Sequence, residues 1–404
     1  MAQAIISRKG GGGGGYATIT FDNAKGNNIA KTTTSPLSSA KRELTATTVG
    51  EYALFGGGMI STELATVDAY NTSLTRSTPT ALSTARRILA AATVGDYALF
   101  GGGYVNSSPY VSATVDAYDI NLTHTTPTVL SVARYNLAAT TVGDYALFGG
   151  GYASSKSSVV DAYNTSLTRS TPTALSVARY DFAATTVGNY ALFGGGYDQS
   201  IRLSTVDAYN SSLTRSTPTE LSTARSLLAA TTVGDYALFG GGSYSDSSGT
   251  HESNIVDAYN TSLTRSNQTE LSLNRDQLSS TTVGGFALFA GGRVYPPGAS
   301  GAYATSVIDA YNENLTHSVP IGLSAPANPA GTTVGNYALF AGQNLVSVGY
   351  ATDAFYIQGN ILVYPGTKYK LGSMTDEATS DSMQMITTTA PITGYIKIKD
   401  ATIN

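Results

Sequence analysis

The sequence predicts an all-β protein in which seven four-stranded blades close a ring, and three observations lead to this prediction. First, between residues 45 and 343 the chain repeats one unit that contains Thr-Val-Gly, Tyr-Ala-Leu-Phe, a run of glycines, Val-Asp-Ala-Tyr and Leu-Ser-x-Ala-Arg. Second, successive units are offset by 44 to 52 residues. Third, the segments are short and lack a helical period. This combination is typical of strands arrayed around an axis.

Each unit predicts four antiparallel strands, and the unit at residues 137–173 shows the pattern. Small residues at 137–142 suit the crowded innermost strand. Tyr-Ala-Leu-Phe at 145–148 is the second strand, and the glycines that follow permit positive φ and close backbone approach. Val-Asp-Ala-Tyr at 160–163 is the third strand. After an Asn-Thr-Ser turn, whose side chains can bond to the backbone, residues 167–173 form the outermost strand.

The two ends of the repeat region predict how the ring closes. Residues 29–41 align without gaps on residues 74–86, so the N-terminal region supplies outer-strand material that lacks a preceding inner pair. The seventh inner pair lies near residues 332–341. Residues 19–21 and 353–356 both resemble the third strand, so the partition of this last blade stays open at this point. Closure by both termini would leave no exposed sheet edge.

The sequence outside the repeats is different in composition. We expect three parts, which are a flexible N-terminal tip with a glycine hinge at 1–15, the ring at 16–358 and a small β appendage at 359–404. Within the appendage, residues 361–371 and 394–399 alternate like strands, and residues 376–382 read as a polar loop.

Composition excludes several classes of function. The net charge is -4 with only 12% charged residues and no Lys/Arg run, which argues against nucleic-acid binding. There is no cysteine, and the three histidines, His124, His251 and His317, have no metal-ligand spacing, so we expect no metal site and no cofactor. No apolar run approaches the ~20 residues of a membrane helix. Residues 1–9 do not read as a secretory signal, so a role outside the cell would require release by lysis or assembly into a particle.

The motifs of the unit resemble the kelch repeat of β-propellers. The features shared are paired glycines after an aromatic-aliphatic strand, a following tyrosine, and an arginine before the next inner strand, over residues 45 to about 356. The resemblance implies a seven-bladed kelch-like β-propeller. The chain departs from kelch repeats where these usually carry tryptophan and this chain carries leucine. These leucines are Leu74, Leu122, Leu167, Leu213, Leu263 and Leu315.

An aspartate recurs in every unit, and we interpret it as a structural residue that accepts hydrogen bonds from turn amides. Glycoside hydrolysis needs two carboxylates a few ångströms apart, whereas repeat-equivalent positions around a ring are too distant to pair. We therefore expect no catalytic residues and no enzyme activity. The aspartates are Asp68, Asp116, Asp161, Asp207, Asp257, Asp309 and Asp353.

Arginines occupy one repeat position just before the inner strand, with Lys41 in the N-terminal copy and Ala327 breaking the series. The kelch resemblance implies that this position lies near one mouth of the central channel, where arginines could bind an acidic ligand. Alternatively, each guanidinium bonds carbonyls of the adjacent blade, since its five donors suit both roles. The arginines are Arg86, Arg134, Arg179, Arg225 and Arg275.

Sequence variation is concentrated near these arginines. The gaps at 104–114, 197–205, 243–255 and 293–307 differ in length and content, and so do the residues that follow each arginine. Tyrosine is frequent there, and it suits adaptable recognition surfaces and sugar rings. We therefore expect the ligand-binding residues to include the arginines above or the variable loops, without deciding between them. The tyrosines concerned are Tyr104, Tyr135, Tyr152, Tyr180 and Tyr197.

The glycine-hinged start and the C-terminal segment are similar to tail or fibre proteins of bacteriophages and prophages. This resemblance implies a non-enzymatic recognition or structural module on a virion or outside the cell, which binds a bacterial cell-surface glycan or protein. Other tail proteins could bind the N-terminal tip or the appendage. The alternative is a bacterial, kelch-like scaffold for protein–protein interaction in the cytoplasm. Neither hypothesis involves nucleic acid or membrane insertion.

Overall fold

The structure, a computed structural model, describes residues 29–295, 301–342 and 352–357 in full, together with the backbone of seven short strands outside these ranges. Every regular element among the described residues is a β-strand. The glycine run at residues 10–15 lies outside the described residues, and so does its predicted role as a hinge.

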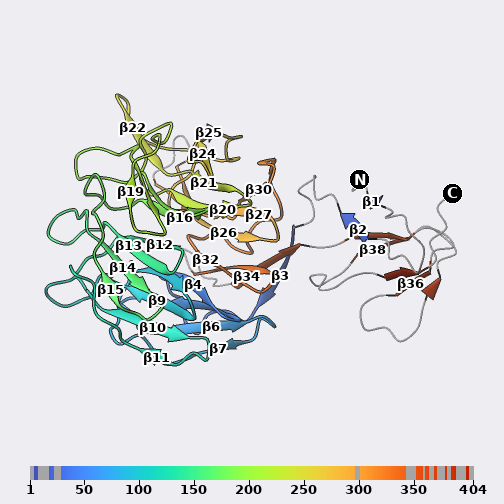
Figure 1. Ribbon diagram of the computed structural model, residues 1–404, viewed down its shortest axis with the longest axis horizontal. Helices are drawn as coiled ribbons and strands as arrows, with labels where there is room; N and C mark the ends of the chain where they lie inside the picture. The colour runs from blue at the N-terminus through green and yellow to red at the C-terminus, as the bar shows by residue number, and fades with distance from the viewer. Residues whose placement is uncertain are drawn as a thin grey trace. The chain divides into compact units, whose positions relative to one another are not determined.

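Seven four-stranded antiparallel sheets form the ring, which confirms the predicted fold class and blade number. In Figure 1 the innermost strands of the sheets, such as β4, β12 and β20, lie around the centre of the ring, and each sheet extends outward from there. The innermost strands are β4 (Thr45–Val49), β8 (Ala90–Val94), β12 (Ala138–Val142), β16 (Ala183–Val187), β20 (Ala229–Val233), β26 (Ser279–Val283) and β32 (Ala330–Val334). The second strands are β5 (Tyr52–Gly56), β9 (Tyr97–Gly101), β13 (Tyr145–Gly149), β17 (Tyr190–Gly194), β21 (Tyr236–Gly240), β27 (Phe286–Ala290) and β33 (Tyr337–Ala341).

The two outer positions follow the same order around the ring. The third strands are β6 (Val67–Asn71), β10 (Val115–Asp119), β14 (Val160–Asn164), β18 (Val206–Asn210), β24 (Val256–Asn260), β30 (Ile308–Asn312) and β34 (Thr352–Ile357). The outermost strands are β7 (Arg76–Ser77), β11 (His124–Thr125), β15 (Arg169–Ser170), β19 (Arg215–Ser216), β25 (Arg265–Asn267), β31 (His317–Ser318) and, for the last blade, β3 (Ile29–Thr34).

The hydrophobic core lies in the layers between blades. Leu54 and Val67 of one blade pack in a cluster with Phe100 and Tyr118 of the next. The two rings meet edge to face, with centroids 5.9 Å apart, which is a favourable aromatic geometry. A Cβ at Gly56 would lie 2.7 Å from the Phe100 ring, so this strand must end in glycine. Leucine, tyrosine and phenylalanine thus fill the layers between blades.

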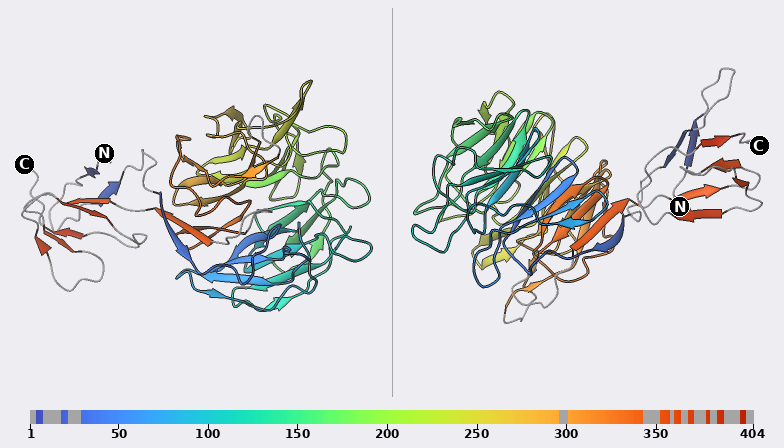
Figure 2. Two further views of the ribbon diagram at one scale, coloured as in Figure 1. Left: turned by 180° about the vertical axis from the view of Figure 1, so that it is seen from behind. Right: turned by 90° about the horizontal axis from the view of Figure 1, so that it is seen from below.

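The last blade combines both ends of the repeat region. Its third strand is β34, and its outermost strand is β3 from the N-terminal side, as Figure 2 shows by the blue strand beside the orange one. The predicted alignment of residues 29–41 is confirmed, because Lys31 pairs with Asp353 at 3.9 Å and Lys41 with Asp68 at 3.0 Å. Of the two segments that the sequence left open for the third strand, residues 353–356 occupy it and residues 19–21 do not. The latter belong to β2 (Thr18–Phe21), which pairs with β1 (Ala4–Ser7).

The outermost strands are shorter than predicted, since β15 covers only Arg169–Ser170 of the expected 167–173. Leu167 has a φ of +58°, a left-handed conformation that breaks the strand. Before it, the Asn164 Oδ1 accepts hydrogen bonds from the amides of Ser166 and Thr168 at 3.0 and 2.9 Å. The turn predicted for Asn-Thr-Ser is thereby confirmed. All six leucines at the position of the kelch tryptophan have positive φ.

Contacts divide the chain into Lys31–Phe355 and a second unit made of Met1–Ala30 and Tyr356–Asn404. The second unit contains the β1–β2 pair and a small set of C-terminal strands, so strands do occur within the predicted appendage at 359–404, whereas residues 16–30 were expected in the ring. Two details differ from the prediction: β37 lies within the expected polar loop, and β38 was not predicted. The strands are β35 (Asn360–Val363), β36 (Lys368–Lys370), β37 (Ala378–Thr379), β38 (Gln384–Thr387) and β39 (Lys397–Lys399).

One end of the ring, which we call the loop face, carries the variable segments. The second strand ends where the innermost strand begins, so the gaps between second and third strands emerge at the same end as the connections between blades. Two gaps contain hairpins, formed by β22 (Ser243–Asp246) with β23 (Gly249–Glu252) and by β28 (Arg293–Val294) with β29 (Tyr303–Ala304). The opposite face carries the tight turns.

Candidate functional site

The five predicted arginines lie inside the protein. The side chains of Arg86, Arg134, Arg179, Arg225 and Arg275 are 0% exposed, so a ligand at the surface does not reach them. The Nη2 of Arg134 donates to the carbonyl of Phe148 at 3.0 Å, as the structural alternative predicts, and to Asp161 Oδ2 at 2.7 Å. Burial lowers the pKa of Arg134, and the Asp161 carboxylate opposes this shift.

The repeated aspartates are the buried partners of these arginines. Asp161 Oδ1 accepts a hydrogen bond from the Ser131 amide at 3.0 Å, which confirms the predicted bond to a turn amide. Ser131 and Arg134 both belong to the connection between blades. Asp161 also pairs with Arg169 of the outermost strand, at 3.3 Å. His124 and His317 take the place of that arginine in two blades, each 2.7 Å from its aspartate. Each aspartate therefore ties its blade to the connection that arrives from the preceding blade.

The five predicted tyrosines, in contrast, come together on the loop face as one continuous row, the tyrosine arc. Consecutive rings lie 5.7, 5.8, 5.2 and 5.7 Å apart between centroids, each pair edge to face. All five side chains are partly exposed. In chain order, the arc consists of Tyr104, Tyr135, Tyr152, Tyr180 and Tyr197.

Backbone pairing places these side chains. The residue after each buried arginine forms an isolated β-bridge with the residue after the glycine pair, as in Tyr135 with Tyr152 and Tyr180 with Tyr197. The connection and the variable loop of one blade thus present adjacent side chains. Burial raises the pKa of both Tyr135 and Tyr180, and neighbouring tyrosines and Asp181 add to the shift. These phenols therefore stay protonated at neutral pH and can donate hydrogen bonds.

A cation stands at each end of the arc. The Arg87 guanidinium lies 4.5 Å from the centroid of the Tyr104 ring, and Arg202 lies 5.9 Å from that of Tyr197. Arg87 also binds Glu43 and, at 3.1 Å, Glu63, so its charge is neutralised within the protein. Within the arc, the ring faces thus already accept cations.

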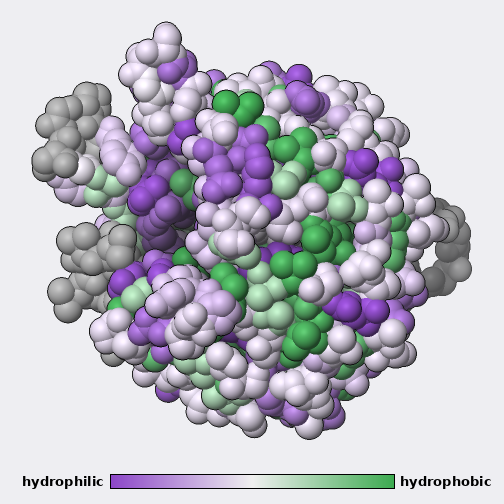
Figure 3. Space-filling model, turned by 90° about the vertical axis from the view of Figure 1, so that its left-hand side faces the viewer, coloured by the Kyte–Doolittle hydropathy of each residue, from purple (hydrophilic) through white to green (hydrophobic). Residues whose placement is uncertain are grey.

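The variable loops extend this surface. Tyr110, in the loop at 104–114, stacks on Tyr104 with centroids 6.2 Å apart and is 51% exposed. On the side of the molecule drawn in Figure 3, hydrophobic residues form small groups among hydrophilic and neutral ones. Tyr110 therefore adds a well-exposed aromatic side chain to the loop face beside the tyrosine arc.

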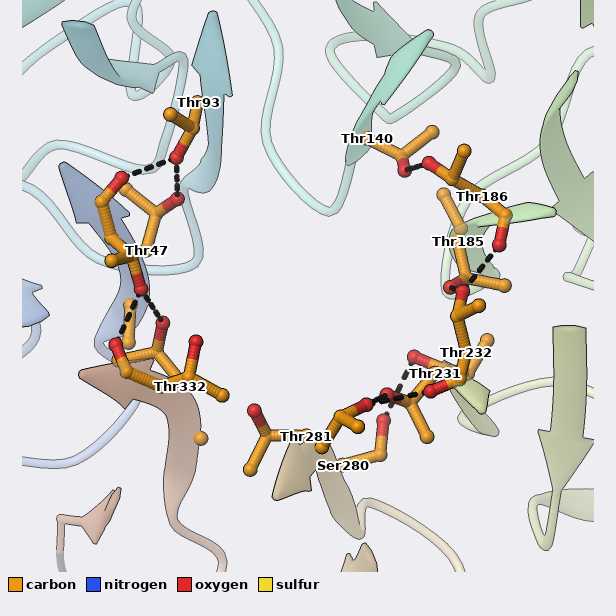
Figure 4. A pocket seen from close by; sticks show the side chains of 17 residues that line it. Thr47, Thr93, Thr140, Thr185, Thr186, Thr231, Thr232, Ser280, Thr281 and Thr332 are labelled. Carbon is orange, nitrogen blue, oxygen red and sulfur yellow. Dashed lines mark hydrogen bonds between the residues drawn. The ribbon is translucent and has the colours of Figure 1, made fainter. Parts of the chain in front are cut away.

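The kelch resemblance implied a central channel, but sequence reasoning missed what lines it: the channel is a cavity of about 340 Å³ lined by threonine, serine, alanine and glycine. Figure 4 shows the threonine hydroxyls that link neighbouring inner strands. The Thr186 Oγ1, for example, donates to the Thr141 carbonyl at 2.6 Å and bonds the Thr140 hydroxyl at 3.0 Å. The Thr-Thr-Val motif that recurs in the innermost strands was the sequence signal for this lining. Its regular bonding between blades indicates a structural role.

Among residues 29–295, 301–342 and 352–357, no group of three or more His, Cys, Asp and Glu side chains is arranged to hold a metal ion. Within the described part of the chain, no helix is long and apolar enough to cross a bilayer.

Comparisons with known proteins agree with the fold. No protein-family model matches the chain, and no curated protein matches it. Among solved structures, that of YjhT is similar, with a TM-score of 0.58 and 13% sequence identity over 71% of this chain and 99% of YjhT. At this identity the likeness shows the fold alone. A β-propeller is consistent with a binding or scaffold module.

Proposed function

We propose that this protein is a non-enzymatic recognition module that binds a bacterial cell-surface glycan through the tyrosine arc. The observation that carries the proposal is the assembly of five partly exposed tyrosines, from three consecutive blades, into one row. Tyrosine offers a large apolar ring together with a hydroxyl, and its side chain loses little conformational entropy on binding. A row of such rings suits an extended chain of sugars.

The charges on the loop face bear on the charge that we expect of the ligand. The buried arginines are paired with aspartates, so they supply no open cationic ring for acidic glycans. At the surface, Lys156 pairs with Asp198 at 3.3 Å, just as Arg87 pairs with two glutamates. These cations are therefore neutralised by carboxylates of the protein, and we do not expect negative charge to be the selected feature of the ligand.

For the place of action, the proposal relies on the resemblance of the two terminal segments. Their similarity to tail and fibre proteins of bacteriophages and prophages supports a location on a virion or outside the cell, and a kelch-like propeller would then be the receptor-binding part. In this proposal the N-terminal tip or the C-terminal β appendage binds other tail proteins.

A second candidate is a scaffold that binds a protein partner through the same face. It is favoured by large apolar side chains at the tips of three loops: Ile60 is 46% exposed, Tyr110 51% and Ile201 62%. Such residues are typical anchors of protein interfaces.

Adsorption of the fluorescently labelled full chain to a panel of bacterial strains distinguishes the candidates. We expect binding to at least one strain, and a loss of at least ~10-fold in affinity after mild periodate oxidation of the cells, because oxidation cleaves sugar rings. Cells treated with protease but not periodate are the control. Adsorption that is lost only after protease would favour the protein ligand, and no adsorption to any strain would contradict both candidates.

A further inference from the structure

The entrance of the central channel on the loop face is bordered by six residues that share a left-handed backbone conformation, with φ between 51° and 57°. Each lies two positions after a buried arginine or lysine, just before an innermost strand, so together they form the rim of the channel. Backbone hydrogen bonds link them between blades, for example from Leu227 N to Asp181 O at 2.8 Å. The rim consists of Glu43, Ile88, Asn136, Asp181, Leu227 and Gln277.

Two rim residues carry carboxylates, and only one of them is neutralised. Glu43 forms an ion pair with Arg87 and a longer one, at 3.9 Å, with Arg42. Asp181 makes no hydrogen bond or ion pair through its carboxylate with any residue that the structure describes, and it is only partly exposed. Burial raises the pKa of Asp181 to about 6. A half-buried carboxylate without a counter-charge is costly, and a cationic ligand would offset that cost.

Asp181 directly follows Tyr180 in the chain, and Tyr180 joins Tyr135 through Tyr152 in the middle of the tyrosine arc. The charge of Asp181 also raises the pKa of Tyr135 and of Tyr180. At the two ends of the arc, Arg87 and Arg202 already lie over tyrosine rings. Among the described residues, no cation lies over Tyr135, Tyr152 or Tyr180. The centre of the arc thus combines aromatic rings and an unpaired carboxylate, the two features that bind ammonium groups.

We propose that Asp181, Tyr135 and Tyr180 form a subsite for a protonated amine, such as the ammonium group of an amino sugar in a cell-surface glycan. The inference rests on the proposed function for the choice of face and names the chemical class that this face selects. The ammonium group donates hydrogen bonds to the Asp181 carboxylate, and its positive charge lies against the rings of the arc.

The subsite has a defined pH dependence. Asp181 is ionised above pH ~6, so affinity for an ammonium ligand rises between about pH 5 and about pH 7, until the amine itself loses its proton. Tyr135 and Tyr180 stay neutral in this range. The neighbouring rim residues, Asn136 and Leu227, are uncharged, and Arg179 is buried in its pair with Asp207 at 2.8 Å. No other described group near Asp181 should titrate in this interval.

The test compares a glucosamine tetrasaccharide with its N-acetylated form, which differ in charge at the same ring positions. By calorimetry with the full chain at neutral pH, we expect the amine form to bind at least ~10-fold more tightly. Asp181→Asn gives the rim the amide that Asn136 provides in the preceding blade, and should reduce the preference to within ~2-fold. Glu43→Gln removes the neutralised rim carboxylate and should keep the preference.

Equal affinity of the wild type for both oligosaccharides, absence of binding to the amine form, or a preference that survives Asp181→Asn would overturn the proposal. Folding is checked by the thermal midpoint, which Asp181→Asn should leave unchanged or raise at neutral pH, because it removes an unpaired buried charge. If periodate-sensitive adsorption to cells persists while the amine preference is absent, the amine subsite fails and the proposed glycan recognition stands.

Discussion

Replacing Asp161 with alanine is expected to lower the free energy of unfolding by ~3–5 kcal/mol, the cost of leaving a buried charge without its partner. The Asp161 carboxylate is fully buried and accepts hydrogen bonds from Arg134 at 2.7 Å and from the Ser131 amide at 3.0 Å. A turn hydrogen bond alone, which is all that the sequence predicts, would give ~1–2 kcal/mol. Urea unfolding followed by circular dichroism measures the difference.

Two variants control for this prediction. Asp144→Ala removes an aspartate from an exposed hairpin turn of the same blade and should change stability by less than ~0.5 kcal/mol. Arg134→Met combined with Asp161→Asn removes both charges and keeps an acceptor for the Ser131 amide, so it should cost less than Asp161→Ala. A loss below ~1 kcal/mol for Asp161→Ala would contradict a buried ion pair at this position.

Deleting residues 1–42 is expected to lower the stability of the whole ring by more than the ~3–5 kcal/mol of one broken buried ion pair. The deletion removes β3, which completes the last blade, and Lys41, whose side chain is buried against Asp68 at 3.0 Å. It also exposes the edge of β34, so aggregation should increase. Thermal unfolding and light scattering measure the two effects.

Deleting only residues 1–15 is the matched control, because it leaves β3 and Lys41 in place. We expect the unfolding midpoint of the ring to stay nearly unchanged. Similar losses from both truncations would contradict closure of the ring by β3.

The repeat made most of the fold predictable. Each copy carries the same turn residues and strand alternation, so blade number and strand positions follow from one unit. The ungapped match of residues 29–41 to 74–86 predicted the closing strand, and Lys31 and Lys41 occupy the ion-pair positions of Arg76 and Arg86. The bounds of the outermost strands could not be predicted, since the left-handed leucines that shorten them have no special residue type.

The pairing of arginine with aspartate was not predicted, although the sequence held a signal for it. In a chain with 12% charged residues, one cation and one anion recur at fixed positions of the unit. Residues about 30 positions apart become neighbours only because the connection between blades folds back over the third strand, as Arg134 does toward Asp161. The sequence therefore left two roles open for the arginines, at a mouth of the channel or bonded to the adjacent blade, and their burial in the core agrees with the second.

The sequence predicted each tyrosine of the candidate site as a ligand-binding residue, but it did not predict that the five side chains contact one another. Each pair belongs to a connection and a variable loop, and the loops differ in length, so spacing along the sequence does not show that Tyr152 meets Tyr180 at 5.2 Å. The rim around the channel was missed altogether, because its six left-handed positions hold six different residue types and none of them is glycine.

Cell adsorption of two double variants tests the central claim, that recognition occurs through the tyrosine arc, most directly. Tyr135→Ser with Tyr180→Ser opens the centre of the arc on the loop face. Tyr97→Ser with Tyr145→Ser removes two partly exposed tyrosines beside the tight turns of the opposite face. We predict that the arc variant loses at least ~10-fold in affinity for the strain bound by the wild type, with an unchanged fold, while the other variant binds normally. Normal adsorption of the arc variant would contradict the claim.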